Sequence, residues 1–314
     1  MLFQEVNMLP SCARGVAAAI IALTGVAAIA QTSTPPALQL ISANGTEISY
    51  VSQGSGAPVV FVHGAVVDLR FWEPQRAAFA KQYRFISYSL RYHGAGGWPD
   101  EGKQYSVETH TADLAAFINA LKLGPVHLVG LSYGGAVAAL LATKEPQLLR
   151  TLTLAEPAVF ALLAESPEGK VALEEWTQGA VPMMTSLKAG DNVGATKQLA
   201  ALVIGDSVEN FDKLPPGLRQ GLLDNARTLP LLFAAPEPTI TCDMLRGVKV
   251  PTLVIRGERT PRFFAATNAA VNKCIAGSKA VTIANASHAM SFDNPMGFNR
   301  AVMGFIGQHA TRKP

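Results

Sequence analysis

Short runs rich in apolar and β-branched residues recur along this chain, and they constrain its fold more than any other feature of the sequence. In Pro58–Val62 all five residues are apolar, which is typical of a strand buried on both faces of a parallel sheet. Helical patterns separate the runs, most clearly over Val107–Leu121. We therefore expect an α/β protein with a doubly wound, mostly parallel sheet. The other strand runs are Arg84–Tyr88, Val126–Val129, Leu149–Leu154, Thr252–Ile255 and Ala280–Ile283.

The start of this alternating pattern and its one interruption predict the domain layout. Leu38–Ile41 and Glu47–Ser52 alternate apolar and polar residues around Asn44-Gly45, which predicts two antiparallel edge strands joined as a hairpin. Between residues 158 and 245 no strand pattern occurs, and helix-prone stretches lie among Gly and Pro. We predict a helical cap over residues 158–245, inserted into a core formed by residues 38–157 and 246–314.

The first 30 residues predict an export signal. Arg14 precedes an apolar run over Gly15–Ala27, and Ala28-Ile29-Ala30 supplies small residues for cleavage after Ala30. The alternative is a signal anchor or transmembrane helix, but the run is shorter than the about 20 residues that a bilayer span needs. We expect a signal peptide over residues 1–30, a linker over residues 31–37, and an exported protein, periplasmic or secreted, with no stable membrane span.

Composition and charge narrow the classes of partner. Hydrophobic residues make up 49% of the 314 residues, which excludes disorder and provides for a large core. The 26 basic and 23 acidic residues give a net charge of +3 without a basic run, so we expect no nucleic acid partner. Cys242 and Cys274 remain after signal removal and form either a disulfide or two buried thiols; neither lies in a metal or redox motif, so we expect no metal site. The oligomeric state stays open.

A candidate nucleophile follows the strand run Val126–Val129. The next residues read Gly130-Leu131-Ser132-Tyr133-Gly134-Gly135, and the small-residue helix Ala136–Ala142 comes after them. A tight strand-to-helix turn brings the neighbours of its central residue against both backbones, so only Gly or Ala fits there. The turn would expose Ser132 at the carboxyl edge of the sheet, where open α/β sheets bind ligands.

At these residues the chain resembles the α/β-hydrolase superfamily, and the resemblance extends from about Leu38 to Gly307. It implies that fold and a hydrolytic reaction that needs no metal or organic cofactor. The order of Ser132 before His288 agrees with it. The motifs that carry it are Gly130–Gly134, His63-Gly64, Ser89–Gly94 and Ala286-Ser287-His288.

The resemblance also implies roles for individual residues. Ser132 would be the nucleophile, and His288 the base that removes its proton, because a short loop after Ala280–Ile283 returns His288 to the edge that carries Ser132. Two backbone N–H groups would form the oxyanion hole, one from Tyr133 after the nucleophile and one from Ala65 after His63-Gly64.

The third member of the expected triad breaks the family pattern. Most members carry an Asp three residues after the glycine that ends the penultimate strand, and Thr260 stands there. Glu156, at the end of Leu149–Leu154, is our preferred acid, because neighbouring strands lie only about 4.8 Å apart. In this the chain looks similar to haloalkane dehalogenases and zearalenone-type lactonases. Glu258 is the second alternative, and the absence of an acid is the third.

A serine nucleophile forms an acyl intermediate, whereas dehalogenases and epoxide hydrolases of this fold use Asp at that position. We expect a carboxylic ester hydrolase that acts on a small apolar ester or lactone. Two alternatives stay open: a non-catalytic ligand-binding protein, and an acyltransferase or cofactor-free perhydrolase with the same Ser and His. Large apolar side chains of the cap and loops are expected to form the substrate pocket: Trp98, Phe160, Trp176, Met183, Met184, Phe233 and Met290.

Overall fold

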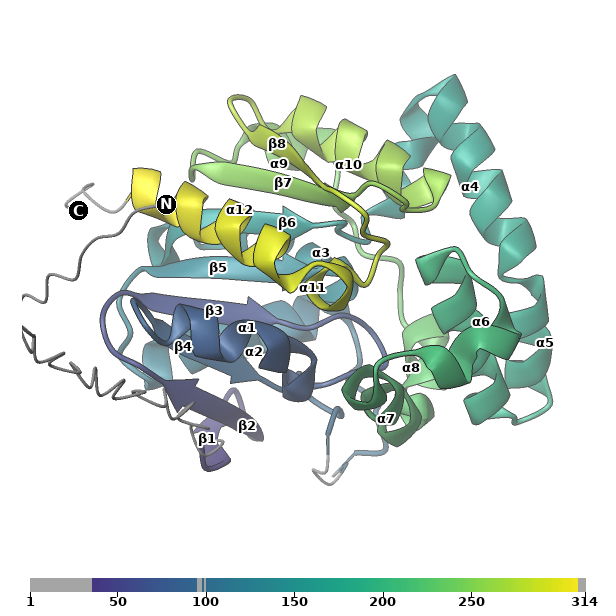
Figure 1. Cartoon of the computed structure of the whole chain (residues 1–314), viewed down its shortest axis with the longest axis horizontal. Helices are drawn as coiled ribbons and strands as arrows, with labels where there is room; N and C mark the ends of the chain where they lie inside the picture. The colour runs from purple at the N-terminus through teal and green to yellow at the C-terminus, as the bar shows by residue number, and fades with distance from the viewer. Residues whose placement is uncertain (1–35, 95–97, 99, 310–314) are drawn as a thin grey trace, which may run out of the picture. The chain divides into compact units, whose positions relative to one another are not determined.

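The computed structural model describes residues 36–94, 98 and 100–309 (Figure 1). The predicted signal peptide and residues 31–35 of the predicted linker lie outside the described residues, so export stays a prediction. In the described part of the chain, no helix combines the length and the apolar character that crossing a membrane requires.

The strands form one eight-stranded sheet with the order β1-β2-β4-β3-β5-β6-β7-β8. Strands β3 to β8 pair in parallel, whereas β2 pairs antiparallel with β1 and with β4. This arrangement confirms the expected fold class. The strands are β1 (Gln39–Ala43), β2 (Thr46–Gln53), β3 (Pro58–Val62), β4 (Arg84–Tyr88), β5 (Val126–Leu131), β6 (Leu149–Ala155), β7 (Thr252–Gly257) and β8 (Lys279–Ile283).

Burial follows from the position of each strand in the sheet. All residues of β3 and β5 are buried, as their runs rich in apolar residues predicted. For β8 the prediction of burial on both faces was wrong. Only Ile283 of β8 is buried, because this strand is the last in the sheet and pairs on one side only.

Helices cover both faces of the sheet, as the alternation of β3 side chains requires. Val59 and Phe61 belong to the core cluster shared with α1 (Glu73–Phe79) and α12 (Pro295–Gln308). Val60 and Val62 belong to the opposite cluster, which includes residues of four other helices. Figure 1 shows α1 and α12 on the near face. The four helices on the other side are α2 (Val107–Ala120), α3 (Ser132–Lys144), α9 (Cys242–Arg246) and α10 (Arg262–Cys274).

The segment between β6 and α9 contains helices and no strand in the described chain. Figure 1 shows α5 to α8 beside the carboxyl ends of the parallel strands, where a cap would cover the site. The predicted cap boundary at residue 245 falls inside α9, which packs with core residues. The α-helices of this segment are α4 (Pro167–Gly179), α5 (Val181–Lys188), α6 (Asn192–Ile204), α7 (Pro216–Asp224) and α8 (Leu229–Ala234). The 3-10 helices η3 (Phe160–Glu165), η4 (Val208–Lys213) and η5 (Ala226–Thr228) lie between them, and the short α11 (Met290–Asp293) follows β8.

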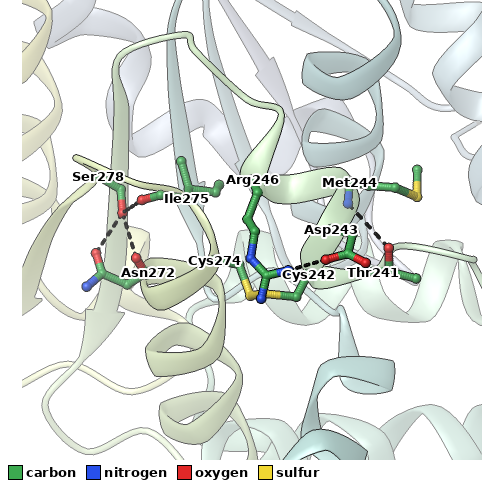
Figure 2. Close-up of a disulfide and its surroundings, with 9 residues drawn as sticks. All are labelled: Thr241, Cys242, Asp243, Met244, Arg246, Asn272, Cys274, Ile275 and Ser278. Carbon is green, nitrogen blue, oxygen red and sulfur yellow. Dashed lines mark hydrogen bonds and ion pairs between the residues drawn. A yellow bond between two sulfur atoms is a disulfide. The ribbon is translucent and has the colours of Figure 1, made fainter.

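A disulfide joins the first residue of α9 to the last residue of α10 (Figure 2). The Cα atoms of Cys242 and Cys274 lie 5.2 Å apart, within the range that a disulfide spans. Thr241 caps α9 by accepting a hydrogen bond from the N–H of Met244. The bridge therefore anchors the chain on the core where it returns from the helical segment.

Replacing both cysteines with alanine is expected to lower the free energy of unfolding by about 3–4 kcal/mol. The bridge spans a sequence separation of 32 residues, and a loop of that length restricts the unfolded chain by about this amount. Urea denaturation of the wild-type protein and of the Cys242→Ala/Cys274→Ala variant measures the difference. Equal stability of the two proteins would contradict the expectation.

Candidate active site

The turn that carries Ser132 has the geometry of a nucleophile elbow. Ser132 is the first residue of α3, directly after β5, and its φ of 54° lies in the left-handed region. A Cβ atom on Gly130 would lie 2.4 Å from the carbonyl oxygen of Gly134, and one on Gly134 would lie 2.3 Å from that of His63. The glycines are therefore required by close backbone contacts, as the motif predicted.

His288 lies between β8 and α11 and is almost completely buried. Its Nδ1 atom is 2.5 Å from Oε2 of Glu156. Its ring stacks on that of Phe264 from α10, with centroids 3.9 Å apart and planes 8° from parallel. The carboxylate and the aromatic ring together fix the orientation of the imidazole, and a hydrogen bond at Nδ1 leaves Nε2 for proton transfer.

Glu156 follows β6 and reaches His288 across the end of β7. It is fully buried, and its φ of 44° is unusual for a residue other than glycine. Its Oε1 atom accepts a hydrogen bond of 2.7 Å from the N–H of Gly257, so both carboxylate oxygens have partners. A Cβ on Gly257 would lie 2.4 Å from the carbonyl oxygens of Ala286 and Ser287. At this strand end, between Glu156 and His288, only glycine fits without a steric clash.

Neither the other candidate acid, Glu258, nor Thr260 at the usual Asp position bonds His288. Glu258 is exposed, and its Oε2 atom accepts a hydrogen bond of 2.7 Å from the N–H of Asn285. Thr260 is half-buried just before α10. The structure therefore brings Glu156, and not Glu258, to the imidazole of His288.

The loop after β3 holds the predicted oxyanion residue Ala65. His63 fixes its start, because Nδ1 donates to the carbonyl of Gly64 at 2.7 Å and Nε2 accepts from the N–H of Leu90 at 2.9 Å. Val66 has a φ of 58° and is fully buried. A β-branched residue in this conformation carries strain of about 1–3 kcal/mol, so the surrounding contacts must hold the loop in place.

The second predicted oxyanion residue, Tyr133, is fixed through its side chain. Its hydroxyl lies 2.8 Å from Nδ1 of His110 on α2. Tyr105 packs on both rings, with centroids 5.6 Å from Tyr133 and 4.8 Å from His110. These contacts fix the first turn of α3 against α2, and with it the N–H of Tyr133.

A cavity of about 220 Å³ unites the four residues Ser132, His288, Ala65 and Tyr133 in its lining. Of the residues predicted to form the substrate pocket, Phe160, Trp176 and Phe233 belong to this lining. The remaining wall is mostly aliphatic and comes largely from the cap helices: Leu199, Ala200, Val203, Ile204, Leu218, Leu222 and Leu232.

Part of the predicted pocket was wrong. Met183, Met184, Met290 and Trp98 do not belong to this lining. Met183 and Met290 are fully buried in the core cluster, Met184 packs against it, and Trp98 stacks under the guanidinium of Arg227. Residue type identified large apolar side chains, but it did not distinguish those in the protein core from those in the cavity wall. Apolar pairs four residues apart on α6 and α7, such as Leu199 with Val203 and Leu218 with Leu222, were the overlooked signal.

Three buried histidines, His63, His93 and His110, lie behind the oxyanion loop. The rings of His63 and His93 are 5.0 Å apart, and those of His93 and His110 are 6.1 Å apart. Burial lowers the pKa of His63 to about 4 and the pKa of His110 to about 3. The cluster is therefore neutral at physiological pH.

Acidification is expected to destabilise the fold through these groups. Since His63 and His110 titrate near 6.5 when unfolded but near 4 and 3 when folded, the unfolded chain binds more protons between these values. The free energy of unfolding therefore decreases as pH falls from 6.5 towards 4. Each group contributes about 1.4 kcal/mol per pH unit. Urea denaturation at pH 6.5, 5.5 and 4.5 should show a slope that is smaller by about this amount in His110→Gln, and an unchanged slope would contradict the assignment.

Within residues 36–94, 98 and 100–309, no group of three or more His, Cys, Asp or Glu side chains is placed to hold a metal ion.

Comparison with known proteins identifies the family. The family model described as the alpha/beta hydrolase fold matches residues 57–295, more than half of the chain. The chain therefore belongs to the α/β-hydrolase family, as the motifs implied.

Relatives and solved structures agree with this assignment. The chain is 27% identical over 281 residues to a non-heme chloroperoxidase of Streptomyces lividans, covering 84% of this chain and 98% of that protein. It is 26% identical over 279 residues to a 2-hydroxy-6-oxo-2,4-heptadienoate hydrolase of Pseudomonas putida, covering 85% and 95%. The enol-lactonase of Burkholderia xenovorans shares the fold with a TM-score of 0.68 at 24% identity, covering 86% of this chain and 100% of the other.

Proposed function

We propose that this protein is a serine hydrolase that cleaves a small, uncharged carboxylic ester or lactone through an acyl-enzyme intermediate. The observation that carries the proposal is the hydrogen bond between His288 and Glu156, in a site where His288 and Ser132 line the same cavity. A carboxylate at Nδ1 selects the tautomer in which Nε2 accepts a proton, and it stabilises the imidazolium that forms.

In the proposed mechanism Nε2 of His288 removes the proton of Ser132 while Oγ attacks the substrate carbonyl. The N–H groups of Ala65 and Tyr133 donate hydrogen bonds to the oxyanion, and each can lower the barrier by about 3 kcal/mol. Nε2 then gives its proton to the leaving alcohol oxygen. A water molecule repeats these steps on the acyl-enzyme and releases the carboxylic acid.

The cavity lining supports an uncharged substrate. Among the described lining residues only Glu237 carries a fixed charge, it is exposed, and no Lys or Arg is present. A substrate carboxylate would therefore lose its hydration without gaining a cation. The aliphatic and aromatic wall instead favours an apolar acyl chain or lactone ring.

Perhydrolysis by the same serine is the second candidate, because a relative at 27% identity is named a non-heme chloroperoxidase. Hydrolysis of p-nitrophenyl butyrate, with product analysis in the presence of hydrogen peroxide or an added alcohol, tests both. Butyric acid as the main product supports hydrolysis. A peracid or a new ester as the main product would move the assignment to acyl transfer. No turnover of a broad ester and lactone panel would favour the non-catalytic ligand-binding alternative.

We further propose that the protein is exported and loses residues 1–30. The Cys242–Cys274 bridge supports this, because disulfides persist mainly in oxidising compartments. Mass spectrometry of the protein from a periplasmic extract is expected to find Gln31 as the first residue. Intact full-length protein confined to the cytoplasm would contradict the proposal.

A further inference from the structure

A buried polar contact connects the cap to the oxyanion loop. Asn225, between α7 and η5, is 1% exposed, and Asp68, three residues after Ala65, is 2% exposed. The Nδ2 group of Asn225 donates to Oδ2 of Asp68 at 2.8 Å, although the two residues are 157 positions apart in the sequence.

The Asn225 side chain makes two further hydrogen bonds. Nδ2 also donates to the carbonyl of Gly221 on α7 at 2.8 Å, and Oδ1 accepts from the N–H of Gly94 at 2.7 Å. One amide side chain thus joins the cap helix, the loop after β3 and the loop after β4. A buried amide that is satisfied in this way fixes its partners, because breaking any one bond leaves a buried polar group unpaired.

Asp68 is held in its ionised form within this contact. Arg70 donates from its backbone N–H and from Nε to Oδ1, and from Nη2 to Oδ2 at 2.6 Å. Arg70 Nη2 also bonds Asp224 at the end of α7, at 2.7 Å. Burial alone would raise the pKa of Asp68, but the hydrogen bonds from Arg70 and Asn225 outweigh it and lower the pKa to about 2.

The contact between Asn225 and Asp68 lies at the end of the loop that would supply the Ala65 N–H to the oxyanion hole. Asp68 ends the loop that contains Ala65 and the strained, fully buried Val66. Val67, between Val66 and Asp68, lines the cavity together with Leu218 and Leu222 of α7. The cap therefore bonds the loop at Asp68, and Val67 belongs to the same buried cluster as Leu218 and Leu222.

We propose that Asn225 is a positioning residue: by bonding Asp68 it couples the placement of the cap to the alignment of the Ala65 N–H in the oxyanion hole. This inference rests on the proposed serine hydrolysis. The alternative is a purely structural role for Asn225, in which the contact holds the cap over the pocket without affecting the oxyanion hole.

Two substrates of different acyl length separate the two roles. We expect the two-carbon acetyl group of p-nitrophenyl acetate to leave the cap side of the cavity unfilled, and the six-carbon hexanoyl group of p-nitrophenyl hexanoate to extend into it. In Asn225→Ala we expect kcat to fall about 10- to 100-fold for both esters, since losing a whole oxyanion donor costs about 10²–10³-fold. A higher KM for the hexanoate, with unchanged kcat for the acetate, would overturn the proposal.

A matched control breaks another contact between the cap and the core. Arg262 of α10 and Glu175 of α4 form an exposed ion pair at 3.0 Å. Glu175→Gln is expected to leave kcat for both esters within about twofold of wild type, because exposed ion pairs contribute little. Loss of acetate turnover in this variant equal to that in Asn225→Ala would overturn the specific role of Asn225.

An exchange of the two side chains keeps the test decisive even where Asn225→Ala does not fold. Asn225→Asp retains the acceptor for Gly94 but sets two carboxylates side by side, so we expect a loss of kcat at least as large. Adding Asp68→Asn restores one donor and one acceptor, and at least a tenfold recovery of kcat is expected. No recovery in soluble protein would overturn the proposal. Full activity of Ser132→Ala would instead refute the proposed function itself.

Discussion

Ser132→Ala is expected to lower kcat for p-nitrophenyl butyrate by about 10⁴- to 10⁶-fold. Without the hydroxyl no acyl-enzyme forms, and only the residual effect of substrate binding and of the oxyanion hole remains. KM should change little, because the Ser132 hydroxyl takes part in the attack and does not belong to the apolar wall of the cavity. Steady-state kinetics with purified protein, after its folding has been checked, measures kcat and KM.

Ser291→Ala provides the control for this experiment. Ser291 is a fully buried serine on α11, close in sequence to His288, and it is not part of the cavity lining. Its variant should keep kcat within about threefold of wild type. Similar activity of wild type and Ser132→Ala would show that another group performs the reaction.

Glu156→Gln is expected to lower kcat by about 10⁴-fold, with a small effect on KM. The amide removes the negative charge that stabilises the imidazolium of His288, and its NH₂ group can stabilise the wrong tautomer. The Oε1 bond to the Gly257 N–H is retained by an amide oxygen, so the fold should survive. The pH dependence of kcat/KM, measured with the kinetics, reports whether the base itself has changed.

Glu258→Gln is the matched control, because it changes a carboxylate that also follows a strand at this edge of the sheet. Glu258 bonds the N–H of Asn285 and not His288. Its variant should retain nearly full activity. A large loss in Glu258→Gln together with a small loss in Glu156→Gln would reverse the assignment of the acid.

The strands and the nucleophile turn could be predicted from the sequence because their determinants are local. Runs rich in apolar residues located β3 and β4 to the residue. The Gly-x-Ser-x-Gly pattern lies within one turn, although Gly134 is required by contact with the backbone of His63 at the end of the neighbouring strand. Glu156 is preferred over Glu258 because it ends a neighbouring strand and because the chain resembles haloalkane dehalogenases and zearalenone-type lactonases in this position. What the sequence did not contain is that the N–H of Gly257 binds Oε1 of Glu156, and that Gly257 leaves space for the carbonyl oxygens of Ala286 and Ser287 just before His288.

The cavity wall and the contact between Asn225 and Asp68 could not be predicted because they depend on packing between distant segments. Met183 and Leu199 are both apolar cap residues, yet one is core and the other lines the cavity. Asn225 has no local signal, since its partners Asp68 and Gly94 belong to loops of the core. The sequence of β8 likewise predicts a central strand, whereas β8 lies at the edge of the sheet.

Covalent labelling of the nucleophile tests the central claim most directly. Wild-type protein treated with a fluorophosphonate that carries a butyl chain is expected to gain one label, and peptide mass spectrometry should find it on the Gly130–Gly134 peptide at Ser132. Glu156→Gln should label much more slowly, and Ser132→Ala not at all. A label on another residue, or equal labelling of Ser132→Ala, would contradict a serine acyl-enzyme mechanism.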